Sequence, residues 1–307
     1  MALAFDAEAI ALPQGAWART HRRYVTRDGR PLIALTSGEY RPYVYPLATP
    51  SGVAVTSEAP ADHPHHHSLW IGADHVHAQV PASEGRVEEY TYNFYLDEVF
   101  QGRAPGRIVE TGVRFAARGD DGATIVQSLE WRGPVEWAAP QGRSILAEER
   151  TTTIAVERDA TLVHQRSRLA PVTWPVRLGP TRHAYFNVRV AETMQAVFGG
   201  RILDDRGATI GATQTPSARW IDYVGPVGGG REAGVALVPL TDVDDGWWFV
   251  ADWGVVTWGP FRRTARALAL GESLSLESCV IAHDGDIGPA RLAELRDRIV
   301  ERARRSR

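Results

Sequence analysis

The stretch that decides the fold is GESLSLESCVIA, residues 271–282. Leu274, Leu276 and Val280 lie on its apolar face, where Ser278 is the one polar break, and polar residues alternate with them. Because successive side chains of a strand point to opposite faces of a sheet, this period of two predicts a half-buried β-strand.

Turn signals separate similar runs along the whole chain. RDGR at 27–30, DDG at 120–122 and ERDA at 157–160 each stand between two strand-like runs, which is typical of hairpins. More than a dozen such runs, with 29 Gly and 19 Pro, predict an all-β fold, a large antiparallel β-sandwich in a single domain over residues 1–307. An apolar stripe after Pro289 predicts a short C-terminal helix over about residues 289–303.

Composition excludes several classes of protein. The net charge of −3 and the pI near 6.4 predict no nucleic-acid partner. The chain contains no lysine, which excludes Schiff-base chemistry and a P-loop, and its single cysteine excludes an internal disulfide. No apolar run is long enough to span a membrane, and the first residues carry acids where a signal peptide carries basic residues. We therefore expect a cytoplasmic protein with no membrane partner.

Six of the ten histidines fall between positions 63 and 77. In an extended segment, His63, His65 and His67 point to one side and His66 to the other. Three interpretations stay open. His63, His65 and His67 ligate a divalent metal ion, or one or two of the histidines act as acid or base, or the loop is merely polar.

Two further stretches carry chemical groups. RHAYFN, residues 182–187, combines a histidine with an aromatic wall and an amide. Four tryptophans, including Trp258, lie within residues 247–258 and offer flat rings that could cover the C–H face of a sugar or pack in the core.

Several segments together resemble one bacterial family. They are Arg41-Pro42-Tyr43, DHPHHHSLW at 62–70, WIDY at 220–223, LGESL at 270–274 and HDG at 283–285. Over about residues 20–287 the chain is similar to the PmoA-like family of unknown function, which is labelled as a methane oxygenase. That family is related to the galactose mutarotase-like supersandwich, so the resemblance implies this fold and a carbohydrate ligand.

The resemblance also implies site residues. The run at 183–187 is similar to the aldose-epimerase strand that carries a catalytic histidine, which assigns that role to His183. An epimerase also uses an arginine and a histidine from its N-terminal half, for which Arg41 and His66 are the nearest candidates.

We therefore expect an enzyme that performs acid–base chemistry on a sugar or glycoside: epimerisation, hydrolysis or elimination near the anomeric carbon. His183 and His66 are the expected acid and base. The expected substrate-binding residues are Arg41, Asp222, Tyr185 and Trp258. The alternatives are a metal-dependent enzyme that uses His63, His65 and His67, and a protein that only binds carbohydrate.

Overall fold

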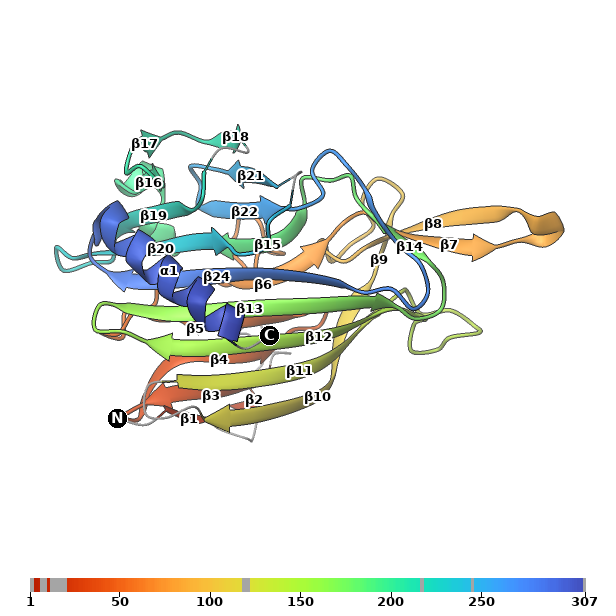
Figure 1. Cartoon of the computed structure of the whole chain (residues 1–307), viewed down its shortest axis with the longest axis horizontal. Helices are drawn as coiled ribbons and strands as arrows, with labels where there is room; N and C mark the ends of the chain where they lie inside the picture. Colours follow the sequence, from red (N-terminus) through yellow and green to blue (C-terminus); the bar gives the residue numbers. More distant parts are fainter. Residues whose placement is uncertain are drawn as a thin grey trace.

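The structure is a computed structural model, which describes residues 3–5, 10–11, 21–117, 122–215, 218–243 and 246–305. The chain is 56% strand and 8% helix, with large antiparallel sheets and one C-terminal helix, so the predicted all-β class is confirmed. Figure 1 shows the helix lying across one of the large sheets.

The described strands form two large sheets and a small one. The ten-stranded sheet has the order β1 (Leu3–Phe5), β3 (His21–Arg27), β4 (Arg30–Ser37), β5 (Pro42–Leu47), β6 (Leu69–Ala73), β15 (Ala184–Arg189), β22 (Val255–Gly259), β21 (Trp247–Val250), β18 (Thr213–Thr215), with β2 (Ile10–Ala11) on β3. The nine-stranded sheet has the order β10 (Arg107–Ala117), β11 (Gly122–Arg132), β12 (Ser144–Val156), β13 (Ala160–Pro171), β24 (Leu274–Asp284), β20 (Glu232–Pro239), β19 (Ile221–Pro226), β16 (Arg201–Asp204), β17 (Thr209–Ile210). The five-stranded sheet has the order β23 (Arg266–Leu268), β14 (Val176–Leu178), β7 (Val76–Pro81), β8 (Val87–Asn93), β9 (Ala104–Pro105). The helical elements are η1 (Ser83–Gly85), η2 (Glu192–Met194), η3 (Ala196–Phe198) and α1 (Gly288–Arg305).

The main core lies between the two large sheets. Buried residues from the ten-stranded sheet, such as Val25 and Ile71, belong to the same apolar cluster as Ile125 and Val163 from the nine-stranded sheet. Alternate residues of each strand therefore point inward to this core, and the others point to the outer face of their sheet.

The turn at 27–30 forms the predicted hairpin between β3 and β4. Asp28 and Gly29 have φ values of 51° and 73°. Positive φ at both central residues matches the twist of two antiparallel strands, and aspartate and glycine tolerate that backbone better than most residues.

The decisive stretch forms most of β24, but it is not half-buried. All residues from Leu276 to His283 are buried. Leu276 and Val280 face the main core, whereas Cys279 and Ile281 pack in a second cluster beneath α1. The helix covers the outer face of the strand, which a period of two within the strand could not reveal.

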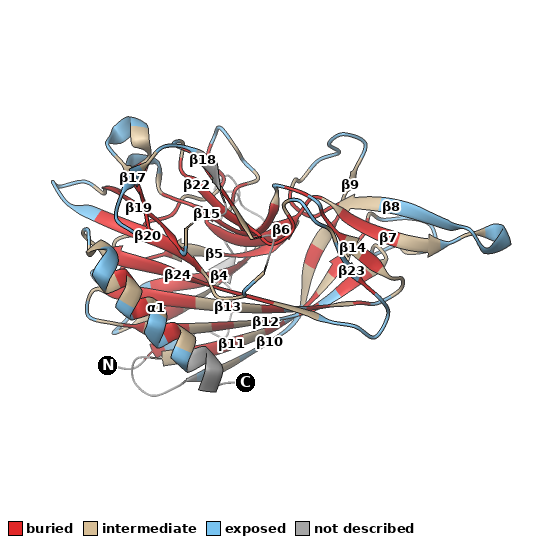
Figure 2. Ribbon diagram, turned by 45° about the horizontal axis from the view of Figure 1, so that its top comes forward, coloured by how far each residue is buried: buried red, intermediate tan, exposed pale blue. Residues whose placement is uncertain are grey.

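The C-terminal helix is amphipathic, as predicted, and it is slightly longer than expected. Leu292, Leu295 and Ile299 are buried against the nine-stranded sheet, while the opposite side of α1 is exposed (Figure 2). In the described part of the chain, no helix has the length and apolar composition needed to cross a membrane.

The small sheet determines where the candidate site lies. The chain leaves the ten-stranded sheet after β6 to enter β7, and it returns from β14 to β15. These two connections are joined by a backbone hydrogen bond of 2.9 Å from Gly179 N–H to the His75 carbonyl. Beyond them, the β7–β8 hairpin projects from the body of the molecule (Figure 1).

Candidate functional site

An aspartate and a histidine face each other where these two connections meet. The antiparallel register pairs Ala73 of β6 with Ala184 of β15. Asp74 and His183 come one residue beyond this pair, and the Asp74 N–H donates to the His183 carbonyl at 3.3 Å. The ends of two neighbouring strands therefore place both side chains together, although 109 positions separate them.

The Asp74 carboxylate is the centre of this arrangement. It is 2% exposed and accepts hydrogen bonds from His183 Nδ1 at 3.0 Å and His75 Nδ1 at 2.7 Å. The Thr181 hydroxyl donates to it as well. Burial alone would raise the pKa of Asp74, but the hydrogen bonds from His183, His75 and Thr181 outweigh burial and lower it. The carboxylate is therefore ionised at neutral pH.

Each of the two imidazoles also contacts an arginine. His75 Nε2 lies 3.1 Å from an Arg103 terminal nitrogen, and Arg182 Nε donates to His183 Nε2 at 3.1 Å. Since an arginine can only donate, both Nε2 atoms accept, and both imidazoles carry their proton on Nδ1. In this tautomer each ring is neutral and presents a basic lone pair at Nε2.

A cavity of about 310 Å³ opens onto this group. Its lining residues are Asp74, His75, Phe100, Gln101, Arg103, Thr181, Arg182 and His183. The His183 side chain is 26% exposed, so a ligand in the cavity can reach the imidazole. The arrangement offers a positioned base, fixed hydrogen-bond donors and an aromatic wall.

The histidine-rich loop packs as a stack of rings beside this cavity. The His63 ring lies 4.2 Å from Trp253 and 4.8 Å from His66, close to parallel with both. His66 also stacks on Trp70 at 4.9 Å. Burial, followed by neighbouring cations such as Arg41, lowers the pKa of His65 to about 3. Burial is also the main cause of the lowered pKa of His66.

Tyr95 connects the histidine loop with His183. Its ring centroid lies 6.1 Å from that of His66 and 5.1 Å from that of His183. The backbone of Phe94 approaches Gly72 so closely that a Cβ there would lie 2.6 Å from the Phe94 carbonyl oxygen. The absence of a side chain at Gly72 therefore allows Tyr95 to reach this position. The structure thus brings the two histidine regions together.

His66, one of the two expected acid–base residues, does not line the cavity. It is 2% exposed, and its Nε2 lies 3.3 Å from the Tyr95 hydroxyl. Its neutral ring packs inside the aromatic stack and supports Tyr95.

The three expected metal ligands do not form one group: the His63 and His65 rings lie 5.7 Å apart, but His67 packs elsewhere. His63 stacks on Trp253, whereas His67 stacks on Tyr43 at 4.7 Å and its Nδ1 accepts from Arg41 at 3.3 Å. Among the described residues, no group of three or more His, Cys, Asp or Glu side chains is placed to hold a metal ion. The side chains present therefore do not fit the metal site that the sequence left open.

Arg41 is buried beneath the histidine-rich loop and contacts its backbone. It is 1% exposed, donates to the His65 carbonyl at 3.2 Å and forms an ion pair with Asp97. Arg41 does not line the cavity, and its contacts are with the histidine-rich loop and Asp97.

Two expected substrate-binding residues, Tyr185 and Trp258, point into the main core. Tyr185 is fully buried, and its hydroxyl lies 2.6 Å from that of Ser167 in the nine-stranded sheet. Trp258 is 4% exposed and stacks near Phe186. Both side chains lie between the sheets, out of reach of a ligand in the cavity.

Asp222 lies on the other large sheet. Ile221 and Tyr223 face the main core, so Asp222 points to the outer face, which α1 covers. Its carboxylate is 1% exposed and lies 3.1 Å from His283 Nε2. Asp222 is therefore not part of the group around His183.

Sequence reasoning missed the main partners of His183. Asp74 was not assigned to His183, and neither Arg103 nor Tyr95 was singled out. The dipeptide Asp74-His75, directly after an apolar strand, was the available signal for Asp74. Arg103 closes a tight turn with Phe100 just before β9, and no sequence motif marks it, so the fold is what identifies it.

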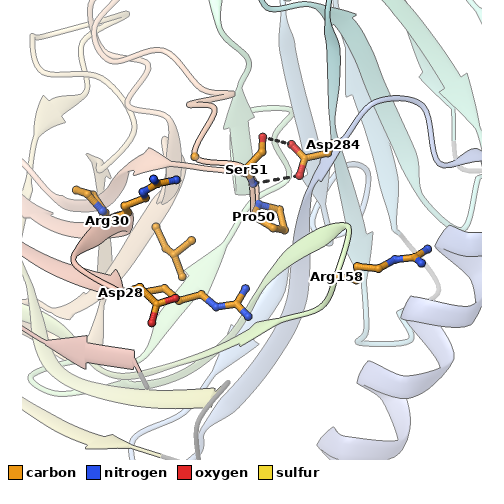
Figure 3. Close-up of a pocket in the computed structure, with 10 residues that line it drawn as sticks. Asp28, Arg30, Pro50, Ser51, Arg158 and Asp284 are labelled. Atoms are coloured by element: carbon orange, nitrogen blue, oxygen red, sulfur yellow. Dashed lines mark hydrogen bonds between the residues drawn. The ribbon is translucent and has the colours of Figure 1, made fainter. Parts of the chain in front are cut away.

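A larger cavity, of about 610 Å³, lies at the other end of the strands near the β3–β4 turn. Figure 3 shows Arg30 and Asp28 on one side and Ser51 bound to Asp284 on the other. Its described lining contains no histidine or cysteine, so it lacks a group that exchanges protons readily near neutral pH.

Comparison with solved structures finds similar architectures at low sequence identity. An α-galactosidase from Geobacillus stearothermophilus is 9% identical, with a TM-score of 0.44, over 90% of this chain and 41% of that protein. A putative aldose 1-epimerase from Escherichia coli is 12% identical, with a TM-score of 0.34, over 92% of this chain and 100% of that protein. The chain thus spans about two fifths of the length of the galactosidase. TM-scores below 0.5 carry no argument about the activity of this chain.

The sequence matches no curated protein. The expected membership of the PmoA-like family was wrong, because the family model that matches is a different one. That model covers residues 23–297, which is most of the chain. The chain therefore belongs to the family of unknown function DUF6807.

Proposed function

We propose that this protein is an enzyme that performs acid–base catalysis on a carbohydrate, with His183 as the proton-transferring residue and Asp74 as its positioning residue. The observation that carries this proposal is the hydrogen bond of 3.0 Å between His183 Nδ1 and the buried Asp74 carboxylate, beside a cavity that leaves His183 accessible.

The chemistry follows from the tautomer. With its proton on Nδ1, neutral His183 accepts a proton at Nε2 from a sugar hydroxyl or from an acidic C–H group. The resulting imidazolium is stabilised by the Asp74 carboxylate, to which Nδ1–H remains bonded. Arg182 must first move from Nε2, and its exposed side chain is free to turn.

The size and lining of the cavity support a sugar as the substrate. A volume of about 310 Å³ suits a small molecule. The Phe100 ring can cover the C–H face of a pyranose, while Thr181, Gln101 and the two arginines bind hydroxyls. The similarity of residues 183–187 to an epimerase strand is consistent with this substrate class. The cytoplasmic location expected from the sequence stays a prediction.

The test is turnover of a panel of neutral aldoses, uronic acids, sugar phosphates and their glycosides, followed by proton NMR of the anomeric region. We expect the wild type to convert at least one of them. His183→Asn should lower that rate by about 10²–10⁴-fold, because asparagine cannot transfer a proton. Its thermal unfolding should match that of the wild type.

His21→Asn is the matched control, because His21 is exposed on β3, three strands away from β6 in the ten-stranded sheet. It should retain full turnover. If His183→Asn is as active as this control, His183 is not the catalytic residue. If the wild type binds sugars but converts none, the protein is a carbohydrate-binding protein instead.

A further inference from the structure

The charges around the cavity are unbalanced. Its lining contains two guanidinium groups, Arg103 and Arg182, against one carboxylate, Asp74. Arg103 and Arg182 donate to Nε2 of His75 and His183, so in this arrangement neither ring holds a second proton. An empty cavity of this kind therefore carries a net positive charge, which attracts an anion.

Asp74 forms an ion pair with Arg103, and a single carboxylate cannot balance the charges of both arginines. His75, His183 and Thr181 donate to the Asp74 oxygens, and Arg103 approaches one oxygen at 3.6 Å, longer than a hydrogen bond. Arg182 lies over the Phe249 ring and donates to His183 Nε2, which is a neutral acceptor. A ligand carboxylate or phosphate would be a stronger acceptor for this guanidinium.

Arg103 is held in place for such a ligand. Its side chain is 13% exposed, and its terminal nitrogens contact His75 at 3.1 Å and Gln101 at 2.9 Å. The Phe100 ring lies 5.7 Å from the guanidinium carbon. Because these contacts fix the guanidinium before a ligand arrives, little side-chain entropy is lost when an anion binds.

We propose that the substrate is an anionic sugar, whose carboxylate or phosphate binds between Arg103 and Arg182. This inference rests on the proposed function and names the substrate class of the same site. When Arg182 turns to the anion, it leaves His183 Nε2, so binding of the acidic group also exposes the base. A neutral sugar would leave Arg182 on His183.

The test is isothermal titration calorimetry of galactose, galacturonate and galactose 6-phosphate, which differ only at C6. We expect at least one anionic sugar to bind more than about tenfold tighter than galactose, with an affinity that falls as salt rises. The two anionic probes distinguish a carboxylate from a phosphate. Arg182→Gln should remove about tenfold or more of that affinity, and Arg182→Lys should restore part of it.

Arg86→Gln is the matched control, because Arg86 is exposed at the end of the β7–β8 hairpin and its side chain bonds to Ser83 in the same turn. It should bind as the wild type does. Arg103→Gln should weaken binding as well, and thermal unfolding checks that this variant still folds. The Arg182 variants are the decisive ones, because an exposed side chain can be replaced without disturbing the fold.

The inference is overturned if neither anionic sugar binds more tightly than galactose, or if Arg182→Gln binds them as well as Arg86→Gln does. Calorimetry detects binding without turnover, so the two proposals can fail separately. If anionic sugars bind through Arg182 but none is converted, the proposed function fails and this inference stands. If only neutral sugars are converted, the proposed function stands and this inference fails.

Discussion

Two Asp–His pairs join residues far apart in the chain, Asp74–His183 and Asp222–His283, and they differ in access. His183 is 26% exposed and lies beside a cavity, with Asp74 behind it. The side chains of His283 and Asp222 are 0% and 1% exposed, under the helix-covered face of the nine-stranded sheet. The same two side chains can thus serve a candidate active site at one place and the packing of the fold at another.

The difference arises from where each pair lies on its strand. Asp74 and His183 lie just beyond the ends of β6 and β15, where the chain turns away toward the small sheet. Asp222 lies within β19, and His283 approaches Gly234 of β20 so closely that a Cβ there would lie 2.1 Å from its ring. Strand ends leave room for a ligand, whereas strand interiors under a helix do not.

The largest expected effect is a difference in kcat between variants of Asp74 and Asp222. Asp74→Asn should lower kcat by about a hundredfold or more, because an amide facing His183 Nδ1 no longer fixes the productive tautomer. Asp222→Asn should leave kcat within about twofold. Steady-state kinetics on the sugar that the wild type converts measures both. Similar losses in the two variants would show that access does not distinguish the pairs.

The next expected effect is on stability, where Asp222→Asn should be the more damaged of the two variants. Asp222→Asn should lower the free energy of unfolding by about 3 kcal/mol, since it breaks a pair that is sealed from water. Asp74→Asn should lower the free energy of unfolding by less, because water in the cavity can solvate the groups that lose the Asp74 carboxylate. Urea denaturation of the two variants side by side gives this comparison. A larger loss of stability in Asp74→Asn would contradict it.

The smallest expected effect is a dependence of stability on pH. Burial lowers the pKa of His283, but the charge and hydrogen bonding of Asp222 outweigh burial, so the pKa is raised from 6.5. When the pKa of a histidine is higher in the folded state than in the unfolded state, it stabilises the fold fully at a pH below the unfolded-state pKa. This stabilisation is lost as the pH rises through the folded-state pKa. The melting temperature should therefore fall as the pH rises above about 6.5, the ordinary pKa of histidine. Asp222→Asn should flatten that fall, and an equal slope in the variant would exclude His283 as its source.

The sequence predicts where the strands lie better than it predicts which face of each strand is buried. The alternation at 271–282 and the Asp28-Gly29 turn are local signals, and the strand and the hairpin both form. The covering of β24 by α1 is a contact between separate elements, and no pattern within the strand contains it. For the same reason Tyr185 and Trp258 could not be placed on the core side from their neighbours alone.

The candidate site was foreseen only in part. His183 and the loop at 63–67 were both singled out, and both contact Tyr95. The partner of His183 depends on the register of β6 against β15, which joins residues far apart in the chain. Asp222 was expected to bind substrate, but a short motif does not show on which sheet its residues lie.

The central claim is that the accessible pair performs the chemistry and the sealed pair does not. Its most direct test is modification by diethyl pyrocarbonate, which reacts with accessible neutral imidazoles, with peptide mass spectrometry and residual turnover followed in the same samples. We expect His183 to react at least about tenfold faster than His283, and turnover to fall in step with modification of His183. The central claim would be contradicted if turnover persisted after His183 was fully modified, or if His283 reacted first.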